Sequence, residues 1–63
     1  MIITGWKSNV NTVDAVKAVH KHTNKSLKES KQFIEIAMDG NPAKLDDDFV
    51  LREELENCGF RVE

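Results

Sequence analysis

The sequence predicts an α+β domain in which helices pack on one face of a small three-stranded sheet. Three observations carry this prediction. Helix-start signals at two places precede apolar residues at helical spacing, glycines follow the ends of two such runs, and β-prone segments stand at both ends of the chain. The expected order is strand-helix-helix-strand-helix-strand. With 63 residues, the chain has room for a single domain over residues 1–63.

The first strand is expected over residues 1–6, which are rich in β-branched and aromatic side chains. A polar stretch leads to Asn11, which can cap a helix over residues 12–22, and Asp14 then faces the positive end of the helix dipole. The apolar stripe of this helix is formed by alanines and valines: Val13, Ala15, Val16, Ala18 and Val19.

The second helix is expected over residues 26–38, because Ser26 and Glu29 have the spacing of a capping box. Gly40 can adopt the left-handed conformation that ends a helix, and Pro42 prevents an immediate restart. The side chains at helical spacing along this helix are Leu27, Ser30, Phe33, Ile34 and Ala37.

A short strand near residues 43–45 should precede the third helix, whose start is marked by the three aspartates of residues 46–48. Gly59 should end that helix, and residues 60–63 alternate apolar with charged side chains as a half-buried strand does. The buried side of the third helix is expected to consist of Phe49, Val50, Leu51, Leu55 and Cys58. Trp6 is expected either to cap the open face of the sheet or to lie in an interface.

Several stretches in order resemble a known family. Residues 13–19 read Val-Asp-Ala-Val-Lys-Ala-Val, residues 27–31 read Leu-Lys-Glu-Ser-Lys, and residues 39–42 read Asp-Gly-Asn-Pro. With the stretch from Leu51 through Gly59 to Val62, they are similar to the C-terminal domain of the bacterial ribosomal large-subunit stalk protein, the L-seven/L-twelve family. The similarity covers nearly the whole chain, and the same order of strands and helices is the fold of that family.

The resemblance implies a non-enzymatic binding module, because the first two helices of the family domain recruit translational GTPases. The implied partner-binding residues are Val13, Lys17, His20, Glu29 and Lys31. The family's tethering helices and hinge have no counterpart here, so we expect a free-standing regulator or competitor. Residues 24–26 replace a glycine-leucine-glycine run of the family, and Asp14 adds a carboxylate to the contact helix.

The distribution of charge also favours a protein partner. Residues 1–34 carry six lysines against two carboxylates, whereas residues 35–63 carry three basic residues against nine carboxylates. The basic half can dock on an acidic surface of a partner, or its lysines can simply keep the surfaces of two helices solvated. A dedicated nucleic-acid binder is not expected, because the isoelectric point is near 5.6 and aromatic residues are few.

Two alternatives to a stalk-like regulator remain open. The chain could be an adaptor or inhibitor in a protease, toxin or phage host-takeover system, or an oligomer-forming module that pairs through a strand edge. Catalytic residues, cofactors and metals are not expected, because Cys58 stands alone and His20 and His22 do not share a helix face. The absence of a signal-like or membrane-length apolar run predicts a cytoplasmic protein.

Overall fold

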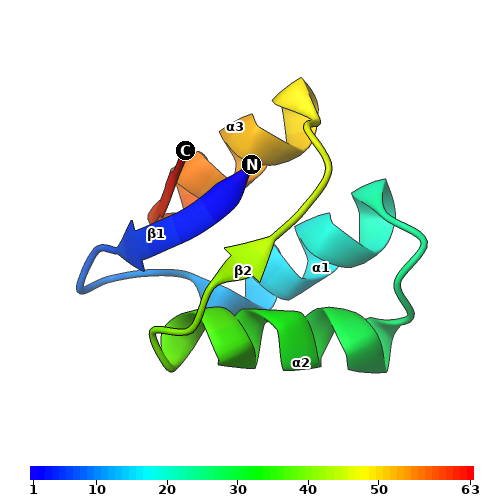
Figure 1. Ribbon diagram of the computed structural model, residues 1–63, viewed down its shortest axis with the longest axis horizontal. Coiled ribbons are helices and arrows are strands. Elements are labelled where there is room, and N and C mark those ends of the chain that lie inside the picture. The colour runs from blue at the N-terminus through cyan, green and yellow to red at the C-terminus, as the bar shows by residue number, and fades with distance from the viewer.

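The chain forms a three-stranded sheet and three helices in the predicted order (Figure 1). The computed structural model describes residues 1–63. Each helix begins and ends close to where the capping signals place it. The elements are β1 (Ile2–Trp6), α1 (Thr12–His22), α2 (Leu27–Met38), β2 (Ala43–Lys44), α3 (Phe49–Cys58) and β3 (Phe60–Val62).

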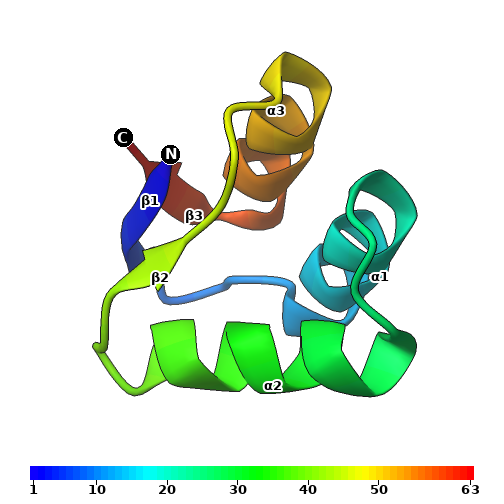
Figure 2. The same cartoon turned by 45° about the vertical axis from the view of Figure 1, so that its right-hand side comes forward.

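The sheet has the order β2-β1-β3, and both pairs are antiparallel. The first strand therefore runs through the centre, and the two termini of the chain lie close together, as Figure 1 shows. The three helices gather on one side of this sheet (Figure 2). The predicted α+β fold class is confirmed.

Capping residues explain the helix boundaries. The Asn11 side chain accepts a hydrogen bond from the amide of Asp14 at 3.1 Å, and Asp48 accepts one from the amide of Leu51 at 3.0 Å. Ser26 and Glu29 exchange both bonds of the predicted capping box. These side chains satisfy backbone amides that would otherwise lack a partner in the first turn.

Gly59 joins α3 to β3 in a conformation that favours glycine. Its φ is +109°, and a Cβ atom here would lie 3.1 Å from the Cα of Val10. Both the left-handed backbone and the close approach of the preceding loop therefore require a residue without a side chain.

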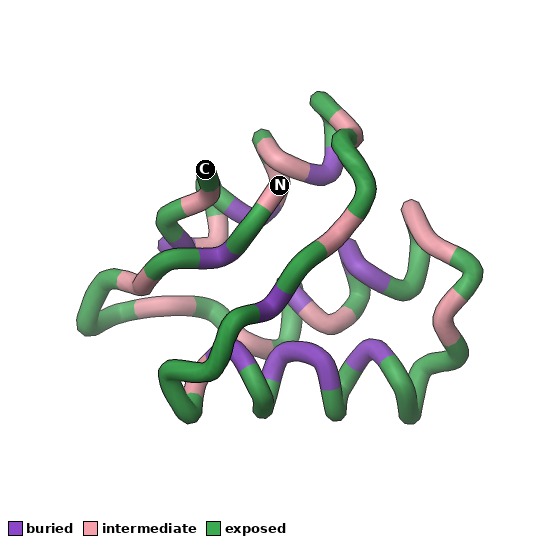
Figure 3. The backbone as a smooth tube through the Cα atoms, viewed as in Figure 1, coloured by how far each residue is buried: buried purple, intermediate pink, exposed green.

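The core lies between the sheet and the helices, and Figure 3 shows the buried positions of α2 along one side of the helix. Eleven apolar residues form a single buried cluster. Val19, Phe33, Ile34, Leu51 and Leu55 belong to it, as expected from the sequence, and Val16 packs against it.

The predicted buried side of α3 is wrong at its start. Phe49 and Val50 are 74% and 51% exposed, whereas Leu51 and Leu55 are buried. Successive helical residues are 100° apart, so Phe49 points about 200° away from Leu51 and faces solvent. The buried face of α3 therefore includes fewer residues than the apolar positions of its sequence suggest.

Trp6 lies neither on the open sheet face nor fully in solvent. It is opposite Phe60 in the β1–β3 pair and packs, partly buried, against the core cluster. Because directly opposed residues point to the same face of a sheet, Trp6 shares the helix-covered face with buried Phe60. Of the two alternatives for Trp6, capping of the open face is wrong, and a place in an interface stays a prediction.

Candidate protein-binding groove between α1 and α2

A groove with a volume of ≈ 510 Å³ runs between α1 and α2. The two helices lie side by side in opposite directions (Figure 1), so the first half of α1 faces the second half of α2. Half of the residues that form the groove are apolar. Its lining consists of Thr12, Val13, Val16, Lys17, Leu27, Lys31, Ile34, Glu35, Met38 and Asp39.

The groove exists because each of the two helices has more apolar side chains than the contact between α1 and α2 buries. Only Ala15, Ala18 and Val19 of α1 are buried. On α2, the side chains of Leu27, Lys31, Ile34 and Met38 follow at intervals of three or four residues and share one face. Ile34 reaches the core, whereas Leu27 stays 56% exposed at the rim. On α1, Val13 is likewise left in solvent and is 63% exposed.

Two lysines give this apolar groove a positive charge at one end. Lys17 comes from α1 and Lys31 from α2, and both are exposed and form no salt bridge. Glu35 and Asp39, near the end of α2, carry the opposite charge on the same lining. The groove can therefore hold an apolar side chain and distinguish the direction in which a charged segment lies.

Three of the five residues expected at the partner surface line this groove, namely Val13, Lys17 and Lys31. Glu29 does not, because its carboxylate accepts the backbone amide of Ser26 at 3.0 Å within the capping box. These Ser26 hydrogen bonds, backbone first and hydroxyl second, lower the pKa of Glu29.

His20 also lies outside the groove. Its Nδ1 atom is 2.9 Å from the carbonyl oxygen of Lys25. Because a carbonyl oxygen only accepts, the ring nitrogen must be the donor. His20 therefore fastens the turn between α1 and α2, and it positions the two helices without lining the space between them.

Sequence reasoning missed the other lining residues. Leu27 and Met38 belong to the apolar pattern of α2, and Thr12, Glu35 and Asp39 stand at helix ends or on outward positions. The spacing of Leu27, Ile34 and Met38 was a usable signal for one wall of the groove. On α1, Val13 and Val16 belong to the expected apolar stripe, but no local signal shows that they face this wall.

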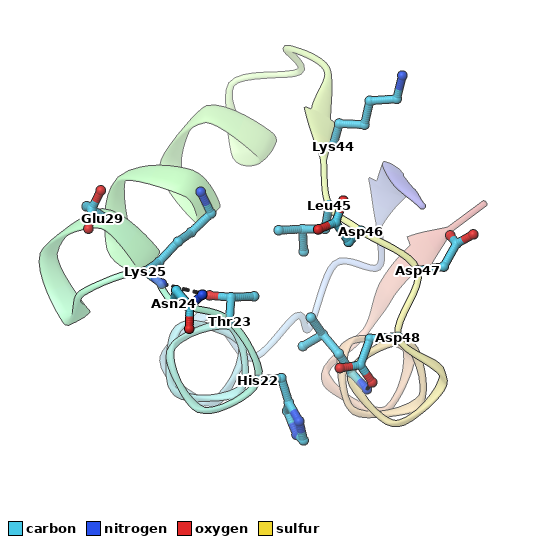
Figure 4. A pocket seen from close by; sticks show the side chains of 11 residues that line it. His22, Thr23, Asn24, Lys25, Glu29, Lys44, Leu45, Asp46, Asp47 and Asp48 are labelled. Carbon is cyan, nitrogen blue, oxygen red and sulfur yellow. Dashed lines mark hydrogen bonds between the residues drawn. The ribbon is translucent and has the colours of Figure 1, made fainter.

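A larger open pocket, ≈ 860 Å³, lies between the α1–α2 turn and the loop that precedes α3 (Figure 4). Residues 22–25 form one side and residues 44–48 the other. Its charged groups are mixed in sign.

Most of these charged groups already hold the fold together. Asp48 caps α3, Glu29 caps α2, and the Nζ atom of Lys25 lies 5.6 Å from the centre of the Phe33 ring. Asp47 lies 2.8 Å from the N-terminal ammonium of Met1, and this hydrogen bond lowers the pKa of its carboxyl group. We therefore interpret this pocket as a region of polar contacts that stabilise the fold, and not as a ligand site.

The structure contains no cluster of three His, Cys, Asp or Glu side chains arranged to hold a metal ion. Cys58 is partly buried at the end of α3, and burial, followed by the charges of Asp14 and Glu54, raises the pKa of its thiol. A raised pKa keeps the thiol protonated at neutral pH, so Cys58 is a poor nucleophile.

No helix of the chain has the length and apolar character needed to cross a membrane. Comparison of the chain with protein-family models, with curated proteins and with solved structures finds no match.

Proposed function

We propose that this chain is a non-enzymatic protein–protein interaction module of the cytoplasm that binds a partner in the α1–α2 groove. It acts as a small regulator or competitor by occupying a surface of that partner. The observation that carries the proposal is the open apolar groove flanked by Lys17 and Lys31 from two different helices.

The groove favours a partner segment with an apolar side chain next to carboxylates. Covering Val13 and Leu27 would remove exposed apolar surface from water, which contributes about 25 cal/mol per Å² of buried apolar area. The two lysines would attract the carboxylates, speed the encounter and set the orientation of the segment.

Translational GTPases are the partners that the resemblance to the ribosomal stalk domain implies. Lys17 and Lys31 match family residues of the contact surface, and both line the groove. His20 and Glu29, at the other matching positions, hold the junction of the same two helices. They contribute to recognition through the geometry of the groove.

Titration of the chain against purified elongation factors by isothermal calorimetry tests this proposal. We expect binding that weakens as salt concentration rises, because counterions screen the lysines with a Debye length of about 8 Å at physiological ionic strength. The double variant Lys17→Glu and Lys31→Glu should bind at least tenfold more weakly, about 1.4 kcal/mol, with an unchanged circular dichroism spectrum.

A matched control separates the groove from net charge. The double variant Lys7→Glu and Lys44→Glu changes the total charge by the same amount at two exposed lysines outside the groove. It should bind nearly as the unaltered chain does. Equal weakening by both double variants would contradict a site in the groove, and absence of binding to every factor would contradict the GTPase assignment.

A further inference from the structure

The most exposed large apolar side chains of the protein fall into two patches. Val13 and Leu27 stand on the α1–α2 groove, and Phe49 and Val50 stand at the start of α3. Phe49, at 74%, is the most exposed of all. We call residues 46–50, with the sequence Asp-Asp-Asp-Phe-Val, the acidic tip.

The tip is acidic, whereas one end of the groove is basic. Phe49 follows three aspartates, and the Asp47 side chain remains 94% exposed although one of its oxygens meets the Met1 ammonium. Asp46 is exposed and forms no salt bridge. The groove presents Lys17 and Lys31, which form no salt bridge, beside its apolar lining at one end, and Glu35 and Asp39 at the other. An apolar anchor next to carboxylates is the chemistry that the groove favours.

Tip and groove cannot meet within one molecule. The start of α3 and the length of α2 lie at opposite ends of the fold in both Figure 1 and Figure 2. Both patches stand on helices that share the single buried core through Leu51 and Ile34. Any contact between them must therefore join two molecules.

We propose that the α1–α2 groove binds the acidic tip of a second copy of this chain. Phe49 enters the apolar part of the groove, and Asp46 and Asp47 lie against Lys17 and Lys31. The groove volume of ≈ 510 Å³ falls within the range of about 300–1,000 Å³ that is usual for pockets of small ligands, which is ample for one aromatic side chain.

Because the tip and the groove lie at opposite ends of the fold, one pair of molecules cannot form this contact twice, so the contact is head-to-tail. The resulting pair still offers a free groove at one end and a free tip at the other, and the assembly grows with concentration instead of closing as a symmetric dimer. The inference rests on the groove being a protein-binding surface, as proposed above. It adds a form of regulation of partner binding, because copies that bind one another compete with the partner for the groove.

Sedimentation equilibrium from about 10 µM to about 1 mM, a range that reveals weak association, tests the proposal. The average mass should rise with concentration, without a plateau at the dimer, and should fall when salt is added. The tip variants Phe49→Ser and Asp46→Lys, and the groove variant with Lys17→Glu and Lys31→Glu, should each stay monomeric. Ile36→Ser, at an exposed apolar residue outside both patches, is the control and should associate as the unaltered chain does.

Mixing the Phe49→Ser variant with the groove variant is the decisive experiment, because it tests whether an intact groove binds an intact tip. The first retains an intact groove and the second retains an intact tip, so the mixture should form a one-to-one pair that grows no further. A monomeric unaltered chain at about 1 mM, association that survives in both variants, or a mixture that stays monomeric would each overturn the proposal.

Partner binding distinguishes this inference from the proposed function. Phe49→Ser leaves the groove intact and should bind an elongation factor at least as tightly as the unaltered chain. If the factor binds in the groove while the unaltered chain stays monomeric, self-association is overturned and the proposed function stands.

Discussion

The Nε2 atom of His22, at the end of α1, lies 2.8 Å from Oε2 of Glu54 in the middle of α3. A carboxylate only accepts, so Nε2 carries the hydrogen. Lys21 adds a longer contact of 3.8 Å to the other oxygen of Glu54. Polar contacts therefore tie α1 to α3, whereas the opposite side of α1 faces α2 across the open groove.

Removal of the Glu54 carboxylate should weaken the contact between α1 and α3 without changing the shape of the groove. We expect Glu54→Ala to lower the free energy of unfolding by about 1 kcal/mol, the usual worth of a side-chain hydrogen bond. Glu54→Gln should lose less, because its amide oxygen can still accept from His22. Urea unfolding of the two variants measures this, and equal losses would mean that the hydrogen bond contributes nothing beyond charge.

Ser30 is fully buried on α2, and its hydroxyl has no hydrogen-bond partner. Ser30→Ala removes an unsatisfied polar group and has a better helix propensity, so it should raise the free energy of unfolding by about 1 kcal/mol. The midpoint of urea denaturation should move upward with an unchanged slope. A lower midpoint would show that the hydroxyl makes a stabilising contact.

The capping box should make the stability of α2 depend on acid. The hydrogen bonds from Ser26 lower the pKa of Glu29 from its ordinary value of 4.5. The stabilisation from this carboxylate is therefore complete above that value and is lost as pH falls through the lower pKa of the folded state.

Thermal unfolding followed from neutral pH to about pH 3 measures this dependence. Glu29→Gln removes the ionisation, so the melting temperature of this variant should decline less steeply in acid than that of the unaltered chain. Parallel declines of the two proteins would show that the capping box does not contribute to the acid response.

The helices could be predicted because residues close to each helix end determine where the helix begins and stops. Asn11, Ser26 and Asp48 each cap the helix that follows, and Gly59 adopts the left-handed conformation at the end of α3. Capping depends on residues within one turn of each other, so a short stretch of sequence contains the whole signal.

The groove could be predicted only in part, because it depends on how far two apolar stripes overlap. Periodicity placed Val13 and Leu27 on apolar faces, but it could not show that both lie beyond the contact between α1 and α2. The same limit explains the error at Phe49, whose apolar character suggested burial while the packing of α3 uses Leu51 and Leu55. Tertiary contact decides which part of an apolar face is covered.

The backbone amide shifts of the isotope-labelled chain, recorded by NMR during addition of a purified elongation factor, are the most direct test of partner binding in the α1–α2 groove. The largest changes should follow the groove, at Val13, Lys17, Leu27, Lys31 and Ile34, and they should vanish in the Lys17→Glu and Lys31→Glu variant. Changes centred on the open face of the sheet or on α3, and retained in that variant, would contradict it.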